Sequence, residues 1–178
     1  MIDSLFSTAP SLDEPLHILS ACHQRIYGQL ETLDRLLRWL PDHGADADAQ
    51  KAAAAVMRYF DTAAVNHHRD EEEDLFPCLI QRVAAEGQYR VKSLVRWAQD
   101  DHAALARKWI VLRAQLKAIA DGESDQLSAD DVANFTARYH NHMDREDNEL
   151  LPYAAQLLTE ADLAVFSRNM KARRRVRA

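Results

Sequence analysis

Hydrophobic residues recur along most of this chain at alternating steps of three and four positions. In the first stretch the repeating positions are Leu16, Leu19, His23, Ile26, Leu30, Leu33, Leu37 and Leu40. This period places their side chains on one face of an α-helix, and the face is apolar enough to turn inward. The same period returns over residues 56–75, 91–119 and 132–157, so the pattern predicts four long helices.

Residues that break helices separate the four stretches. The breaks fall at residues 41–44, which include Pro41 and Gly44, at Gly87 and at Asp121–Gly122. Helices joined by such short connections pack as antiparallel neighbours. The predicted fold class is therefore all-α, with an up-down-up-down four-helix bundle.

Polar residues suited to helix N-termini support these boundaries. Ser11 and Ser128 each stand shortly before acidic residues, as N-caps of the first and fourth helices would. A short final helix is expected to begin near Thr159, which acidic residues also follow. We expect the bundle to occupy residues 1–160 and a C-terminal helix with a basic tail to occupy residues 161–178.

The composition agrees with a helical protein and limits the kinds of molecule that it would bind. The 178 residues include 4 glycines and 5 prolines, too few for a collagen-like or low-complexity chain, and 47% of residues are apolar. Residues 1–170 carry 17 basic and 28 acidic residues, a formal charge of −11, which would repel nucleic acid and anionic membranes. Five basic residues lie in the last eight positions, where a short solvated tail is the simplest interpretation.

The cysteines and the absence of targeting signals in the sequence indicate the expected cellular location of the protein. Cys22 and Cys78 give no disulfide framework, and the sequence shows neither a signal peptide nor an apolar run that could cross a membrane. A reduced, cytoplasmic location without membrane partners is therefore expected. Self-association into a homodimer is compatible with the sequence, which offers no direct argument for it.

Each of the four inward faces is interrupted by a histidine, and two faces add a glutamate four residues further on. The polar positions are His23, His67, Glu71, His102, His142 and Glu146. At a rise of about 1.5 Å per residue from the predicted turns, all of them lie near the middle of the bundle. Burying two carboxylates would cost several kcal/mol each unless they were paired, protonated or bound to metal. We therefore expect these side chains to form one site.

An internal repeat surrounds the two His–Glu pairs. Residues 67–77 and 142–152 both follow the pattern H-x-x-x-E-x-x-x-L-[FL]-P. A histidine and a glutamate at positions i and i+4 share a helix face, so both can reach one metal ion. His68 and Glu72 have the same spacing as His67 and Glu71. The repeat favours the latter pair, which keeps the distance to the proline, and the former stays open as an alternative.

The ligand types limit the choice of metal. Imidazole and carboxylate groups suit iron, manganese or zinc, and the inward faces show no cysteine pair typical of a soft thiolate site. Six ligands divide naturally between two metals, with Glu71 and Glu146 able to bridge them. A di-iron centre fits this set best, ahead of zinc or manganese. The remaining alternative is a buried hydrogen-bonded His–Glu network without metal.

At these residues the chain resembles the hemerythrin-like, or HHE cation-binding, family over about residues 12–157. The stretch His-His-x-x-Glu-Glu-Glu-x-Leu-Phe-Pro at residues 67–77 carries the resemblance most specifically. The resemblance implies a four-helix bundle with two non-haem irons, joined by an oxo bridge, and ligands at His23, His67, Glu71, His102, His142 and Glu146. Oxygen carriers of this family have a second histidine on the third helix, where this chain has Ala98 and Ala106.

With four site histidines and two glutamates, the chain is similar to the bacterial di-iron proteins of iron–sulfur repair and nitric-oxide response. That resemblance implies binding or sensing of O2, NO or peroxide, or handling of iron, rather than dedicated oxygen transport. Two other functions stay open: a regulatory or interaction module with a structural metal, and a di-iron oxidase or peroxidase. The sequence shows no substrate pocket, so it does not decide whether the protein is an enzyme.

Overall fold

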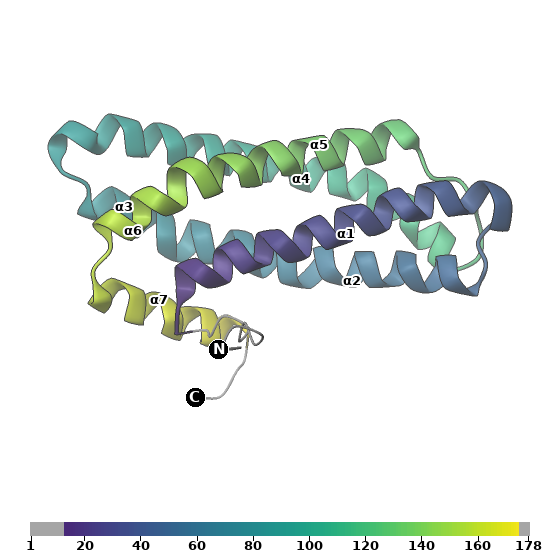
Figure 1. Cartoon of the computed structure of the whole chain (residues 1–178), viewed down its shortest axis with the longest axis horizontal. Helices are drawn as coiled ribbons and strands as arrows, with labels where there is room; N and C mark the ends of the chain where they lie inside the picture. Colours follow the sequence, from purple (N-terminus) through teal and green to yellow (C-terminus); the bar gives the residue numbers. More distant parts are fainter. Residues whose placement is uncertain (1–12, 175–178) are drawn as a thin grey trace, which may run out of the picture.

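Four long helical rods packed side by side make up most of the structure, a computed structural model that describes residues 13–174 (Figure 1). Successive rods run in opposite directions, so the predicted up-down-up-down bundle is confirmed. The first and third rods are single helices, α1 (Pro15–His43) and α4 (Gln88–Ala120). The second and fourth rods begin with α2 (Ala47–Asp70) and α5 (Ala129–Arg145).

The second and fourth rods change their hydrogen bonding at the same point of the internal repeat. The second rod passes from α2 through a π-helical turn, η1 (Glu71–Leu75), into α3 (Phe76–Arg82). The fourth passes from α5 through the π-helical turn η3 (Glu146–Leu150) into α6 (Leu151–Leu157). A 3-10 turn, η2 (Ala85–Gly87), then connects α3 to α4.

A proline accounts for each π-helical turn. Pro77 and Pro152 stand at the second position of the helix that follows the turn. Neither has an N–H to donate, and the ring crowds the carbonyl four residues back. The N–H of the residue before each proline bonds instead to the carbonyl five residues back, which belongs to Glu71 or Glu146. The two predicted site glutamates therefore begin the two π-helical turns.

Most helix ends match the predicted boundaries. Ser128 caps α5, and Thr159 forms a capping box at the start of the final helix, whereas Ser11 lies outside the described residues. The first break differs, because α1 continues through Pro41 and ends at Gly44. Gly44 has a φ of 64°, a left-handed conformation that glycine adopts without strain, so the glycine rather than the proline ends the helix.

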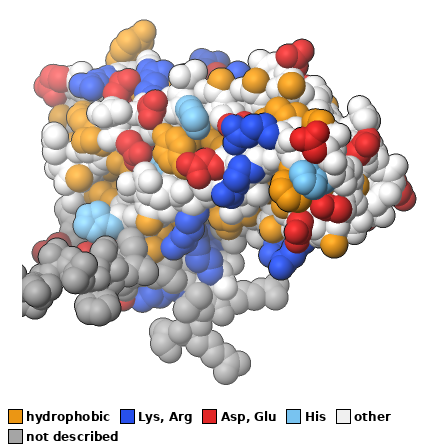
Figure 2. Space-filling model, turned by 45° about the vertical axis from the view of Figure 1, so that its right-hand side comes forward, with side chains coloured by type: hydrophobic (Ala, Val, Ile, Leu, Met, Phe, Trp, Pro, Cys, Tyr) orange, Lys and Arg blue, Asp and Glu red, His pale blue; other side chains and the backbone are white. Residues whose placement is uncertain are grey.

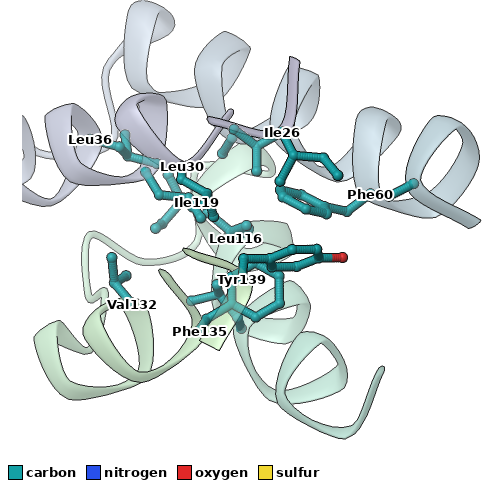
Figure 3. Close-up of a cluster of buried hydrophobic side chains, with 14 of the residues drawn as sticks. Ile26, Leu30, Leu36, Phe60, Leu116, Ile119, Val132, Phe135 and Tyr139 are labelled. Carbon is teal, nitrogen blue, oxygen red and sulfur yellow. The ribbon is translucent and has the colours of Figure 1, made fainter. Parts of the chain in front are cut away.

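The interior contains two apolar clusters, and the polar residues of every rod come between them. Figure 3 shows one cluster, in which Phe60 and Phe135 pack against leucines of α1 and α4. The other cluster includes Phe76 and Leu150 and lies toward the opposite end of the rods. Among residues 13–174, no helix is both long and apolar enough to pass through a lipid bilayer.

Helix α7 (Glu160–Arg173) packs against α1, α2 and η1 (Figure 1). Its Phe166 and Met170 are buried in the second apolar cluster. At its C-terminal end, Arg173 and Arg174 both form ion pairs with Asp70, a fully buried carboxylate in the last turn of α2. Helix α7 is therefore held to the site-bearing rod by apolar contacts and by a buried ionic contact.

The interpretation of the basic C-terminal residues as a solvated tail is wrong for those that the structure describes. Arg173 also pairs with Glu73 and Asp74 of η1, at 2.9 and 2.8 Å. Arg175 and Arg177 lie outside the described residues. Acidic and basic side chains likewise lie near one another over the face shown in Figure 2. The basic end of the chain therefore neutralises acidic groups of the bundle itself.

Replacing Arg173 with alanine should destabilise the protein, because it removes one of the cations that pair with the buried carboxylate of Asp70. We expect the free energy of unfolding to fall by about 3 kcal/mol, as when a buried ion pair is broken. Arg168→Ala, on the exposed side of α7, is the matched control and should change it by less than about 0.5 kcal/mol. Urea unfolding followed by circular dichroism measures both, and equal small losses would contradict the assigned role.

Candidate metal centre

The polar side chains predicted to form one site come together between the two apolar clusters. His23 comes from α1 and His102 from α4, and the two His–Glu pairs come from the junctions of α2 with η1 and of α5 with η3. The buried set is His23, His67, Glu71, His102, His142 and Glu146, with at most 4% of any residue's surface exposed. The structure thus gathers residues that are up to 123 positions apart in the sequence.

Imidazole nitrogens surround the two carboxylates. Four Nε2 atoms lie 3.2–3.5 Å from an oxygen of Glu71 or Glu146, and they belong to His23, His67, His102 and His142. Within the described residues, the oxygens of both carboxylates and the Nε2 atoms of His23 and His67 have no hydrogen-bond partner. Buried polar atoms are nearly always paired, so such a cluster is unfavourable by itself. A cation would satisfy the nitrogens and oxygens together, so these residues fit a metal.

The ligand atoms of the six predicted residues form two overlapping groups that could each hold a metal ion, and a third such group joins His68 to His102 and His142. The first group contains His23, His67, Glu71 and Glu146, and the second contains Glu71, His102, His142 and Glu146. Within each group, one ligand atom of every residue lies within 4.8 Å of those of the others. Both glutamates belong to both groups, so each carboxylate faces two pairs of imidazoles.

Two of the imidazoles are oriented by a further carboxylate at their other nitrogen. Nδ1 of His23 lies 2.8 Å from Asp147, and Nδ1 of His102 lies 2.7 Å from Glu72. A carboxylate at Nδ1 holds the N–H there and leaves the Nε2 lone pair for a metal. The sequence pattern did not predict this role for either acid. The signal was available, because each one directly follows a glutamate of the repeat.

A third carboxylate, that of Asp101, lies beside the imidazole of His142 at a longer distance. Its Oδ2 atom lies 3.3 Å from Nδ1 of His142, and its Oδ1 atom pairs with Arg138. Burial would raise the pKa of Asp101, but the imidazole of His142 and the guanidinium of Arg138 lower it below its usual value. Asp101 therefore remains an anion beside the imidazole.

The two alternative His–Glu pairs of the second rod both lie at the site. His67 and Glu71 are buried within the cluster, as the repeat favoured. Glu72 is partly exposed and reaches His102 from outside the cluster. The ring of His68 stacks on the ring of His102, with centroids 3.9 Å apart. His68 is thus a site residue that the preferred assignment left out, while Glu72 takes a supporting position.

Burial and charge set the protonation of the metal-free site. Burial disfavours a protonated imidazole, but the carboxylates of Asp147 and Glu146 raise the pKa of His23 to about 10. Two carboxylates likewise raise the pKa of His102 to about 10 against the effect of its burial. Burial and the charge of Glu146 raise the pKa of Glu71 to about 7. At neutral pH the metal-free site therefore holds protons that a cation must displace.

Known sequences resemble this chain over most of its length. Residues 14–154 match the family model described as the hemerythrin HHE cation binding domain, a match that contains all six predicted site residues. A protein of Haemophilus influenzae, described as an uncharacterized protein, is 28% identical over 165 residues. The aligned part makes up 93% of this chain and 92% of that protein, so the likeness covers nearly the full length of both.

Removing the carboxylate at His23 should weaken metal binding without removing a direct ligand. We expect Asp147→Ala to lower the affinity for Fe(II) about 10- to 100-fold, because the imidazole loses the acceptor that orients it. Asp144→Ala, an exposed carboxylate on the same rod, should change the affinity less than about twofold. Competition with a chelator measures both affinities. Equal affinities for the Asp147 variant and the wild type would contradict this role.

Metal binding should release protons, because imidazole ligands must be neutral. His23 and His102 have pKa values of about 10 in the metal-free protein, so both are protonated at pH 8. We expect the release of about two protons per protein at pH 8 and a metal affinity that rises with pH. Calorimetric titration in two buffers of different ionisation enthalpy gives the number. Release of less than about half a proton would contradict these protonation states.

Proposed function

This chain belongs to the hemerythrin HHE cation-binding domain family, and on that premise we propose that its buried cluster holds a non-haem di-iron centre. The centre binds or senses a small ligand, namely O2, NO or peroxide, or it handles iron. The observation that carries the proposal is the sharing of both glutamates between the two groups of ligand atoms. A carboxylate that faces two imidazole pairs is placed to bridge two ions.

The proposed assignment divides the six side chains between two ions. His23 and His67 would hold one ion, and His102 and His142 would hold the other. Glu71 and Glu146 would bridge or cap the two ions. Support for this comes from the carboxylate oxygens, which accept no hydrogen bond from the described residues. Nitrogen and oxygen donors of this kind suit iron.

The ligand count favours a reactive centre over a closed structural one. Two imidazoles and two shared carboxylates would give each ion four donors, fewer than the six of an octahedral ion, and open positions in a non-haem iron site take up external ligands. Iron in such a centre binds small ligands and changes its oxidation state. The protein's own groups hold the donors in place, while the two apolar clusters keep bulk water from the site.

Protein produced with iron should contain about two irons per chain and, once oxidised, show a near-ultraviolet band of a bridged iron pair. The double variant His67→Ala, His142→Ala should lose both properties because it removes one imidazole from each ion. Exposed histidines provide the matched control, His17→Ala with His140→Ala, which should keep both. Circular dichroism verifies that each variant is folded. Stoichiometric zinc, or no bound metal, would disprove the di-iron proposal.

Titration of the reduced, iron-loaded protein with O2, NO and peroxide identifies the ligand. A spectral change with one or more of them is the expected result. The spectrum could instead stay unchanged with all three ligands while the melting temperature still depends on metal. The centre would then be structural, and the protein would be a binding module.

A further inference from the structure

The internal repeat places residues of like chemistry at several positions of the site. His67, Glu71 and Glu72 have counterparts of like chemistry in the second repeat. The position after the first histidine differs, because His68 is matched by Met143, a fully buried thioether. The first repeat therefore carries an additional imidazole at a position where the second repeat carries a thioether.

The surroundings of His68 place its ring beside the second group of ligands. A nitrogen of His68, one of His102 and one of His142 all lie within 4.8 Å of one another. The rings of His68 and His102 are stacked, 3.9 Å apart and inclined by only 13°. Nε2 of His68 is buried and has no hydrogen-bond partner among the described residues. A buried ring nitrogen without a partner is unfavourable, so a group absent from the protein chain is its natural partner.

The stacking argues against His68 as a ligand of the same ion as His102. An ion bound by an imidazole nitrogen lies in the plane of that ring, and one ion cannot lie in two parallel planes that are stacked. A small molecule bound to this ion on the side of His68 would extend from the plane of the His102 ring toward the ring of His68.

We propose that His68 hydrogen-bonds the outer atom of a small diatomic or triatomic ligand that binds the ion held by His102 and His142. The inference rests on the proposed function, because it requires that ion. It also predicts which of the two ions binds the ligand. The ligand binds at the ion beside His68, an imidazole that the second repeat replaces with Met143.

Azide serves as the probe, added to the oxidised iron-loaded protein. His68→Phe keeps a ring over His102 and removes the nitrogen, so azide should bind at least about tenfold more weakly, with the iron content unchanged. His68→Gln keeps an N–H donor and should restore much of the affinity. In D2O the azide stretching band should shift for the wild type and for His68→Gln, but not for His68→Phe. His140→Phe, at an exposed position of α5, is the control and should match the wild type.

Two results would overturn the inference. Unchanged azide affinity and an unchanged D2O shift in His68→Phe would show that His68 makes no hydrogen bond to the ligand. Loss of one iron from His68→Phe would show that His68 is a metal ligand instead. Failure of the proposed function is distinguishable, because the wild type would then lack two irons before any azide is added.

Discussion

Two buried carboxylates in the middle of a helical bundle are the constraint on which the rest of this structure depends. Glu71 and Glu146 are fully buried, and within residues 13–174 no group donates a hydrogen bond to their oxygens. Such groups persist only where cations or protons offset the loss of hydration. The imidazoles of His23 and His102 supply protons in the metal-free protein, and a metal pair would replace those protons. The polar layer therefore depends on positive charge beside the two carboxylates, which bound protons or a metal pair would supply.

The two repeats meet this constraint with the same parts and stabilise them differently. Each repeat supplies a histidine, a buried glutamate, an adjoining acid for an imidazole of another rod, and a proline that produces a π-helical turn. Asp70 of the first repeat corresponds to Arg145 of the second. Arg145 pairs with Glu149 on its own rod, whereas Asp70 is buried and needs the arginines at the end of α7. The end of helix α7 thus supplies the cations that the buried carboxylate of the first repeat requires.

Most of the fold could be predicted from the sequence because its determinants act over a few residues. The step of three and four positions requires only a helix and an apolar interior, and Ser128 and Thr159 cap helices through groups three residues away. The π-helical turns were not predicted, although Pro77 and Pro152 cause them locally. A proline in a helical pattern can also end or kink a helix, and the neighbouring rods decide which of these occurs.

The same distinction between local and long-range determinants applies to the site. By itself, the sequence determined which histidines and glutamates face inward and at what depth, because the helical period sets the direction of each side chain relative to its own helix. Only the tertiary structure decided that His68 stacks on His102, that Glu72 and Asp147 orient imidazoles of other rods, and that Arg173 pairs with Asp70. These contacts join different helices. They depend on how far each helix is rotated and shifted against its neighbours, which the packing of the whole bundle sets and no single helix encodes.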